Sequence, residues 1–137
     1  MSFKSNLINI VLVETSHPGN IGSVARAMKT MGLSELSLVN PRKFPSGEAN
    51  ALSGNAMDVL ENAKIYDSIE EAIKDSTFVY ATSSRSRTIQ WPTVHAEEGA
   101  SLINDQVTSG KKVSILFGRE DRGLTNDELQ LANTHIE

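Results

Sequence analysis

Apolar residues along the chain fall into short continuous runs that alternate with stretches of helical spacing. The runs at residues 8–13, 36–39, 77–82 and 112–117 have the length and composition of buried strands. Between the first two runs, apolar residues at positions 21, 24, 25, 28 and 31 repeat at the spacing of one helix face, and Gly32 follows as a C-terminal cap residue. The pattern therefore predicts a strand, a helix and a second strand in the first third of the chain.

The rest of the chain continues the same alternation. Two capping boxes, Ser68-Ile-Glu-Glu71 and Thr125-Asn-Asp-Glu128, mark the starts of helices that we predict to reach Asp75 and Ala132. We also predict helices over residues 49–60 and 95–109, a brief strand over residues 63–66, and a polar, basic loop over residues 83–92.

Strands that alternate with helices are typical of βαβ units. We therefore predict one α/β domain over residues 1–137, with a mainly parallel sheet and helices on both faces. In such sheets ligands bind beyond the carboxyl ends of the strands. The loops that follow those ends span residues 14–20, 40–47, 83–92 and 118–124, and we expect the chemistry of the protein to lie there.

Composition narrows the function classes. The chain has 137 residues and no cysteine, which fits a reducing, cytoplasmic location and excludes disulfides, thiolate metal sites and a cysteine nucleophile. Its three histidines are widely spaced, with no HExxH motif and no acidic cluster beside them, so we expect no metal site. The apolar run at residues 7–13 is too short to span a bilayer and follows no basic segment, so we expect neither a signal peptide nor a membrane anchor.

Charge is unevenly distributed along the sequence. The formal net charge of −4 argues weakly against a nucleic-acid partner. However, residues 16–47 and 76–95 carry a net positive charge, whereas residues 48–75 are strongly acidic. The folded chain is therefore expected either to present a basic face opposite an acidic one or to spread these charges over a solvated surface.

The glycine-containing loops do not match the common nucleotide motifs. The segment GNIGSV after the first strand is not GxGxxG, which argues against a dinucleotide site. The segment GREDRGLT has the glycine spacing of a phosphate loop, but Leu124 stands where the lysine is required. No GxSxG motif is present, so a serine hydrolase of that type is excluded as well.

Three features keep two interpretations each when they are considered alone. The hydroxyl-rich residues 82–84 form either a polar turn or a ligand site at a strand end. Gly118 either makes a tight turn or lets the backbone approach a ligand. Arg26 either pairs with a carboxylate such as Glu14 or Glu120, or contributes to a site at the start of its helix.

Taken together, three segments resemble a known family. They are VLVETSHPGNIGSVARAMKTMGLSELSLVNP, ATSSRSRTIQWP and LFGREDRGLTNDEL, and they occur in the family's order over essentially the whole chain. This combination is similar to the SPOUT superfamily of RNA methyltransferases. Within it, the chain most resembles the TrmJ group, which methylates the ribose 2′-hydroxyl at nucleotide 32 of the tRNA anticodon loop.

The resemblance assigns roles to individual residues. It implies that Asn20 and Arg26 belong to the first motif, with Asn20 at the RNA and Arg26 as the catalytic or substrate-orienting residue. It implies that the cofactor S-adenosylmethionine contacts Thr82, Ser83, Ser84, Gly118 and Glu120. Because they lie on the same loops, Arg85, Arg87 and Arg119 are candidates for contacts with the phosphates of tRNA.

The resemblance also implies an architecture and leaves alternatives. The family fold is an α/β knot, and its members are homodimers whose active site is completed across the interface. A third motif is expected to begin right after His135 and Ile136, so we expect the knot-forming segment to be missing from a chain that stops at Glu137. The alternative functions are methylation of ribosomal RNA or of another tRNA position, and a non-catalytic RNA-binding module.

Overall fold

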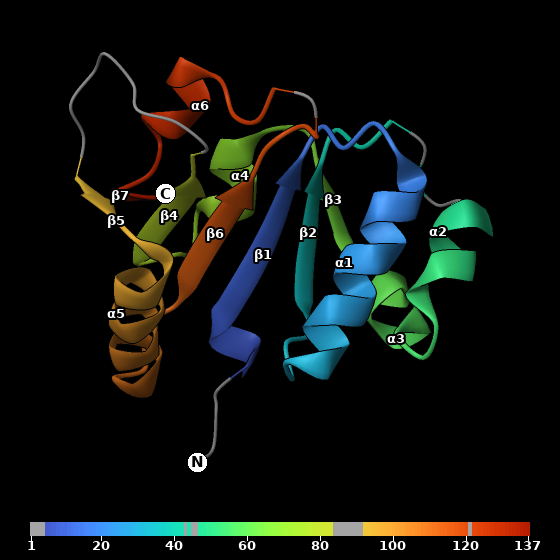
Figure 1. The fold of residues 1–137 in the computed structure, drawn as a ribbon, viewed down its shortest axis with the longest axis horizontal. Helices are drawn as coiled ribbons and strands as arrows, with labels where there is room; N and C mark the ends of the chain where they lie inside the picture. Colours follow the sequence, from blue (N-terminus) through green and yellow to red (C-terminus); the bar gives the residue numbers. More distant parts are fainter. Residues whose placement is uncertain (1–4, 43, 45–46, 84–91, 121) are drawn as a thin grey trace.

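The computed structural model describes residues 5–42, 44, 47–83, 92–120 and 122–137 (Figure 1). Its strands form a seven-stranded sheet in the order β3-β2-β1-β6-β4-β7-β5, and all the pairings are parallel. The strands are β1 (Ile8–Val13), β2 (Glu35–Val39), β3 (Lys64–Tyr66), β4 (Phe78–Thr82), β5 (Thr93–Val94), β6 (Val113–Phe117) and β7 (Thr134–Ile136). This confirms the predicted α/β class.

Helices cover both faces of the sheet, as a parallel sheet requires. The helices α1 (Pro18–Thr30), α2 (Gly47–Ser53), α3 (Met57–Glu61) and α5 (Ala96–Thr108) pack on one face. The helices α4 (Ile69–Ile73) and α6 (Asn126–Leu129) pack on the other, and a short 3₁₀ turn, η1 (Ser5–Leu7), precedes β1. No helix in the described part of the chain is long and apolar enough to cross a membrane.

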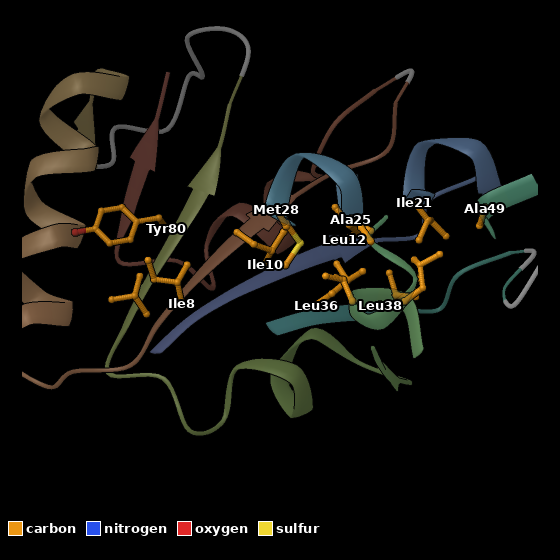
Figure 2. Packing of buried hydrophobic residues seen from close by; sticks show 14 of the residues in the cluster. Ile8, Ile10, Leu12, Ile21, Ala25, Met28, Leu36, Leu38, Ala49 and Tyr80 are labelled. Atoms are coloured by element: carbon orange, nitrogen blue, oxygen red, sulfur yellow. The ribbon is translucent and has the colours of Figure 1, made fainter. Parts of the chain in front are cut away.

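The two faces of β1 belong to two separate cores. Ile8, Ile10 and Leu12 face α1 and α5, whereas Val11 and Val13 face α4 and α6. Figure 2 shows side chains of α1 directed at those of β1 and β2 in the first core. Because successive strand residues point to opposite faces, the apolar run that identified β1, interrupted only by Asn9, follows directly from burial on both sides.

A polar network crosses the sheet within this apolar surround. The buried Asn9 amide donates to the Ala72 carbonyl oxygen and to the Ser114 hydroxyl, both at 3.1 Å. Its carbonyl oxygen accepts a bond of 2.6 Å from the Ser37 hydroxyl. Since buried polar groups are costly without partners, these bonds fix how β2, β1 and β6 align with α4.

The helix α1 is limited by its sequence at both ends. Pro18 is its first residue, where the missing N–H costs nothing. At the other end Gly32 adopts a φ of 78°, and the N–H groups of Gly32 and Leu33 donate to the carbonyls of Lys29 and Met28. This Schellman arrangement confirms the predicted glycine cap.

The helix packs very closely against α2. A Cβ atom on Gly22 would lie 2.2 Å from the carbonyl oxygen of Ala49, so the two backbones touch at a distance that no other residue type allows. This contact sets where α2 lies.

Several expected boundaries are wrong. The helix predicted over residues 49–60 is two helices, because Gly54 adopts a φ of 57° between α2 and α3. The helices α4 and α6 end at Ile73 and Leu129, earlier than predicted, and β5 and β7 are not predicted at all. Both strands are short and lie on one side of the sheet, β5 at the edge and β7 next to it. β7 buries one side chain and β5 buries none, so no apolar run arises.

Candidate functional site

The carboxyl ends of β1 and β6 lie side by side, but the chain leaves them toward opposite faces of the sheet. β1 leads into α1, which packs on the first core, whereas β6 leads through residues 118–124 to α6 on the second. Figure 1 shows both arrowheads at the same end of the sheet, the end at which α1 also begins. Such a divergence opens a crevice at which open α/β sheets bind their ligands.

A pocket of about 360 Å³ lies at this crevice. It is lined by the apolar side chains of Leu12, Val24 and Phe117, by the polar side chains of Thr15, Asn20 and Ser23, and by Gly118 and Glu120. Phe117 is 37% exposed, which is unusual for a large apolar residue at the end of a central strand. The structure thus brings together three of the predicted site residues, Asn20, Gly118 and Glu120. It also adds Thr15, Ser23 and Phe117, which lie within the quoted segments but were assigned no role from the sequence.

Gly118 is sterically required at the start of the loop. A Cβ atom there would lie 2.1 Å from the carbonyl carbon of Gly123 and 2.3 Å from the backbone nitrogen of Leu124. The N–H of Arg119 and the carbonyl of Gly123 bond to each other at 3.2 Å, and the reverse bond measures 2.8 Å. The loop therefore folds back on itself as a tight hairpin that forms one wall of the pocket.

Glu120 joins this loop to the start of α1. Its carboxylate accepts hydrogen bonds from the Ser16 hydroxyl at 3.1 Å and from the N–H groups of Ser16 and His17 at 3.4 and 3.0 Å. His17 is the N-cap residue of α1, and its own side chain caps nothing. Burial raises the pKa of Glu120, but the hydrogen bonds from His17 and Ser16 outweigh it and hold that pKa below its usual value. Glu120 therefore acts as a charged cap of α1, and its contact with the cofactor stays a prediction.

Arg119 points away from the pocket. Its guanidinium donates two parallel bonds, of 2.9 and 3.0 Å, to the carboxylate of Glu128 and forms an ion pair of 2.9 Å with Glu14. The hydrogen bonds with Glu128 raise the pKa of Arg119 further above its already high usual value. Both carboxylates occupy the guanidinium, which favours a structural role over the predicted phosphate contact.

Glu14 is held in an uncommon backbone conformation. Its φ is 53°, in the left-handed region that non-glycine residues rarely adopt. Its N–H donates to the carbonyl of Val39 at 2.8 Å, and its carboxylate meets Arg119. The backbone at the end of β1 is therefore fixed from two sides.

Thr82 and Ser83 lie at the neighbouring strand end. The strand β4 pairs with β6, so Thr82 emerges beside the start of the loop that carries Gly118. The Thr82 hydroxyl donates to the Leu116 carbonyl at 3.1 Å, and the Ser83 N–H donates to the Ile136 carbonyl at 2.8 Å. These two residues share the sheet edge with the pocket but do not line it. Of the other predicted site residues, Ser84, Arg85 and Arg87 lie outside the described residues.

Arg26 lies on another side of α1. It is exposed, and a Cβ atom on Gly54 would lie 3.8 Å from its Cδ and Nε atoms, which places it beside the turn between α2 and α3. Neither of the carboxylates considered from the sequence pairs with it, because Glu14 binds Arg119 and Glu120 binds the start of α1. Arg26 does not line the pocket.

Comparison with known families identifies the fold. The model of the SpoU rRNA methylase family matches residues 7–137. The chain belongs to this family. Its membership confirms the resemblance that was drawn from the three sequence segments. In the described part of the chain, no group of three or more His, Asp or Glu side chains is arranged to hold a metal ion.

The SpoU family members most similar to this chain include named tRNA methyltransferases. The tRNA (cytidine/uridine-2′-O-)-methyltransferase TrmJ of Sodalis glossinidius is 51% identical over 130 residues, which cover 95% of this chain and 51% of that protein. The tRNA (cytidine/uridine/adenosine-2′-O-)-methyltransferase TrmJ of Pseudomonas aeruginosa is 47% identical over 129 residues, 94% of this chain and 50% of that protein. The chain therefore spans about half the length of the curated relatives it matches.

Solved structures of the family superpose closely. A probable methylase family protein from Haemophilus influenzae has a TM-score of 0.89 at 45% identity, with 96% of this chain and 55% of that chain covered. The structure of TrmJ from Z. mobilis has a TM-score of 0.88 at 39% identity, with 93% and 56% covered. The SpoU methyltransferase AviRb from Streptomyces viridochromogenes, solved in complex with the cofactor AdoMet, shares only the fold, with a TM-score of 0.68 at 17% identity over 93% of this chain and 49% of that one.

Proposed function

We propose that this chain carries the catalytic fold of a tRNA methyltransferase that acts on a ribose 2′-hydroxyl, at nucleotide 32 of the anticodon loop, with S-adenosylmethionine as methyl donor. One observation carries the proposal. In a chain about 50% identical to named tRNA 2′-O-methyltransferases, the pocket at the divergence of β1 and β6 gathers Asn20, Gly118 and Glu120. The absence of cysteine supports a cytoplasmic location.

The ends of three adjacent strands fit the proposed cofactor. β4 lies between β6 and β7, so the backbone at Thr82, Ser83 and Gly118 emerges at one edge of the sheet. Backbone groups and small hydroxyl side chains at such an edge are the donors and acceptors that a nucleoside and an amino-acid moiety require. We propose that these residues hold the cofactor beside the pocket.

The proposed reaction needs alignment more than it needs a nucleophile from the protein. S-adenosylmethionine supplies an already activated methyl group when it is bound, so a chain without cysteine is no obstacle. We propose that Arg26 grips the phosphate or ribose of the substrate and stabilises negative charge that develops on the 2′-oxygen. Because a guanidinium is a poor base, the hydroxyl proton is expected to leave through phosphate or water.

A homodimer would reconcile the position of Arg26 with this role. Arg26 follows Asn20 by six residues on α1, about 120° away around the helix axis, and lies beside Gly54 and not at the pocket. We propose that Arg26 serves the pocket of a second copy. Mixing Arg26→Ala protein with protein inactivated at Gly118 is then expected to restore activity. A mixture of these two inactive variants that stays inactive would contradict the shared site.

The decisive experiment is methylation by the full-length protein. It is incubated with labelled S-adenosylmethionine and total RNA, and the modified nucleotide is mapped. Label at the 2′-oxygen of nucleotide 32 in tRNA supports the proposal. The absence of labelled RNA contradicts it and favours a non-catalytic RNA-binding module.

Variants of α1 then test the role of Arg26. Arg26→Ala is expected to lower turnover at saturating tRNA by about 100-fold or more, the range for losing a group that stabilises transition-state charge. Arg26→Lys is expected to recover part of it, because lysine keeps the charge but not the bidentate fork. Lys29→Ala, which removes an exposed cation one turn away that pairs with Asp58, serves as the matched control. Wild-type turnover in Arg26→Ala would remove Arg26 from the mechanism.

The arginines of the loop at residues 83–92 are tested by salt dependence. If Arg85 or Arg87 contacts a tRNA phosphate, its removal weakens binding uniformly across sequences and reduces the slope of log affinity against log salt by about 0.7–0.9. An unchanged slope would count against the contact.

A second candidate substrate is ribosomal RNA. The description of the family model names rRNA methylases, and this is the observation that favours it. In the mapping experiment this candidate predicts label in ribosomal RNA and none in tRNA.

A further inference from the structure

The three consecutive residues 118–120 after β6 alternate between the two sides of their loop. Gly118 and Glu120 line the pocket, whereas Arg119 between them is directed to the opposite side of the loop. The side chain of Arg119 is only 15% exposed, as is that of its partner Glu128. Burying a charged pair costs desolvation free energy, which only good hydrogen-bond geometry offsets. Here two parallel bonds of 2.9 and 3.0 Å provide that geometry.

The carboxylate of Glu128 takes part in two interactions. Its carboxylate accepts a bond of 2.7 Å from the N–H of Thr125 and thereby completes the capping box of α6. The same carboxylate holds Arg119, whose guanidinium also reaches Glu14 at the end of β1. One cation therefore connects the start of α6, the pocket loop and the end of β1.

The opposite side of the loop is fixed independently. Glu120 binds Ser16 and His17, which follow Glu14 by two and three residues in the same connection after β1. The pocket loop is thus attached to the β1–α1 connection through Arg119 on one side and Glu120 on the other. Nothing in this arrangement requires Arg119 to touch a ligand.

We propose that Arg119 and Glu128 are positioning residues, which hold the pocket wall formed by Gly118 and Glu120 in the geometry that binds the methyl donor. This inference rests on the proposed function for its ligand. The interaction of Arg119 with Glu128, which we call the clamp, is a property of the chain itself. It replaces the phosphate contact predicted for Arg119, and the two roles make opposite predictions. If Arg119 contacts a phosphate, substitution of Arg119 affects binding and substitution of Glu128 does not. If the two residues form a clamp, substitution of either one has the same effect.

The test is a double-mutant cycle in the full-length protein. S-adenosylmethionine binding is measured by calorimetry at 25 °C for Arg119→Ala, Glu128→Gln and the double variant. Each single change is expected to weaken binding by up to about 100-fold, the effect of a small misplacement in a positioned site. The double variant is expected to be no weaker than the worse single variant, because both changes remove the same interaction. Arg119→Lys, which keeps the charge and loses the fork, is expected to fall between wild type and Arg119→Ala.

Asp127→Asn is the matched control. It removes a carboxylate from the neighbouring position of α6 that is not bonded to Arg119, and cofactor affinity is expected to stay at the wild-type value. Additive losses in the cycle would overturn the clamp. So would a lower melting temperature with unchanged affinity at 25 °C, because that is the signature of a purely structural pair. Weaker tRNA binding with a shallower salt slope in Arg119→Ala alone would restore the phosphate contact.

A ligand-independent readout separates this inference from the proposed function. The N–H of Gly123 donates across the loop to Arg119, and the Ser16 N–H donates to Glu120. Their hydrogen exchange is expected to accelerate in Arg119→Ala and Glu128→Gln and to be unchanged in Asp127→Asn. If the wild-type protein binds no S-adenosylmethionine, the proposed function fails, and exchange that does not change in any variant refutes the clamp.

Discussion

Replacing Gly118 by alanine is the most direct test of the loop geometry. The backbone of Gly118 does not need the left-handed conformation, so alanine introduces no torsional strain, and the entire effect comes from one methyl group. That methyl would lie 2.1, 2.3 and 2.6 Å from three backbone atoms of Gly123 and Leu124. Ordinary contacts of carbon atoms lie at about 3.5–4.0 Å, so the two sides of the hairpin must separate by more than 1 Å.

The cost follows from the nature of the atoms that must move. An extra methyl group in a packed site typically costs about 1–3 kcal/mol, with the lower values where a flexible side chain can yield. Here only backbone yields, and it carries the paired bonds between Arg119 and Gly123. We therefore expect Gly118→Ala to lower the free energy of unfolding by about 3 kcal/mol, and the melting temperature by roughly 10 °C.

Urea unfolding followed by circular dichroism measures this change. Gly47→Ala is the matched control, because an added Cβ at Gly47 meets nothing within 4 Å and the residue lies at the exposed start of α2. The control is expected to change the free energy of unfolding by no more than about 0.5 kcal/mol. If Gly118→Ala unfolds at the same urea concentration as the control, the tight hairpin deduced for residues 118–124 is wrong.

Three further substitutions test other parts of the fold and the site. Gly22→Ala pushes a methyl group to 2.2 Å from the backbone carbonyl of Ala49 and is expected to cost about 2–3 kcal/mol, measured by urea unfolding. Asn9→Leu removes the hydrogen bonds of Asn9 with the buried hydroxyls of Ser37 and Ser114 and is expected to cost about 1–3 kcal/mol, and wild-type stability would show that these bonds contribute nothing. For Glu128, burial raises the pKa, but the bonds from Arg119 and the capping box lower it below its usual value of 4.5. The stability from Glu128 is therefore present above pH 4.5 and is lost as the pH falls below it. Between pH 5 and 3, the free energy of unfolding of Glu128→Gln is expected to change less with pH than that of the wild type, and equal slopes in the two proteins would contradict this.

The central strands and α1 could be predicted because each is surrounded by apolar partners. β1 is buried along its whole length, so its sequence is apolar at every position except Asn9. Edge strands lack this signal, and β5 has only the two residues Thr93 and Val94. The break between α2 and α3 also escapes the pattern, because apolar spacing continues across it while Gly54 turns the backbone.

The residues of the candidate site could be predicted as separate motifs, but not their mutual contacts. Asn20 lies in the first turn of α1, and Gly118 and Glu120 lie on the loop after β6. Both segments follow strand ends at one sheet edge, and sheet topology is enough to bring them together. The partners of Arg119 are different, since the sequence shows Glu128 only as half of a capping box and offers Glu14 only as a possible partner of Arg26. A left-handed φ at Glu14 has no sequence signature for a residue of its type, so the contact that depends on it could not be foreseen.

Each side of α1 faces a different part of the molecule, and this determines which of its residues can contact a ligand. Ile21, Ala25 and Met28 face the core, and Gly22 is pressed against α2, so these positions have no freedom to serve a ligand. The pocket takes the next side of the helix, and Arg26 occupies the remaining one, beside the turn at Gly54. An arginine placed there has its charge in solvent and not in its own pocket. A catalytic role for Arg26 therefore implies that RNA or a second copy of the chain covers this side of α1. Gly54, which has no side chain beside the Cδ atom of Arg26, is expected to lie under the same contact.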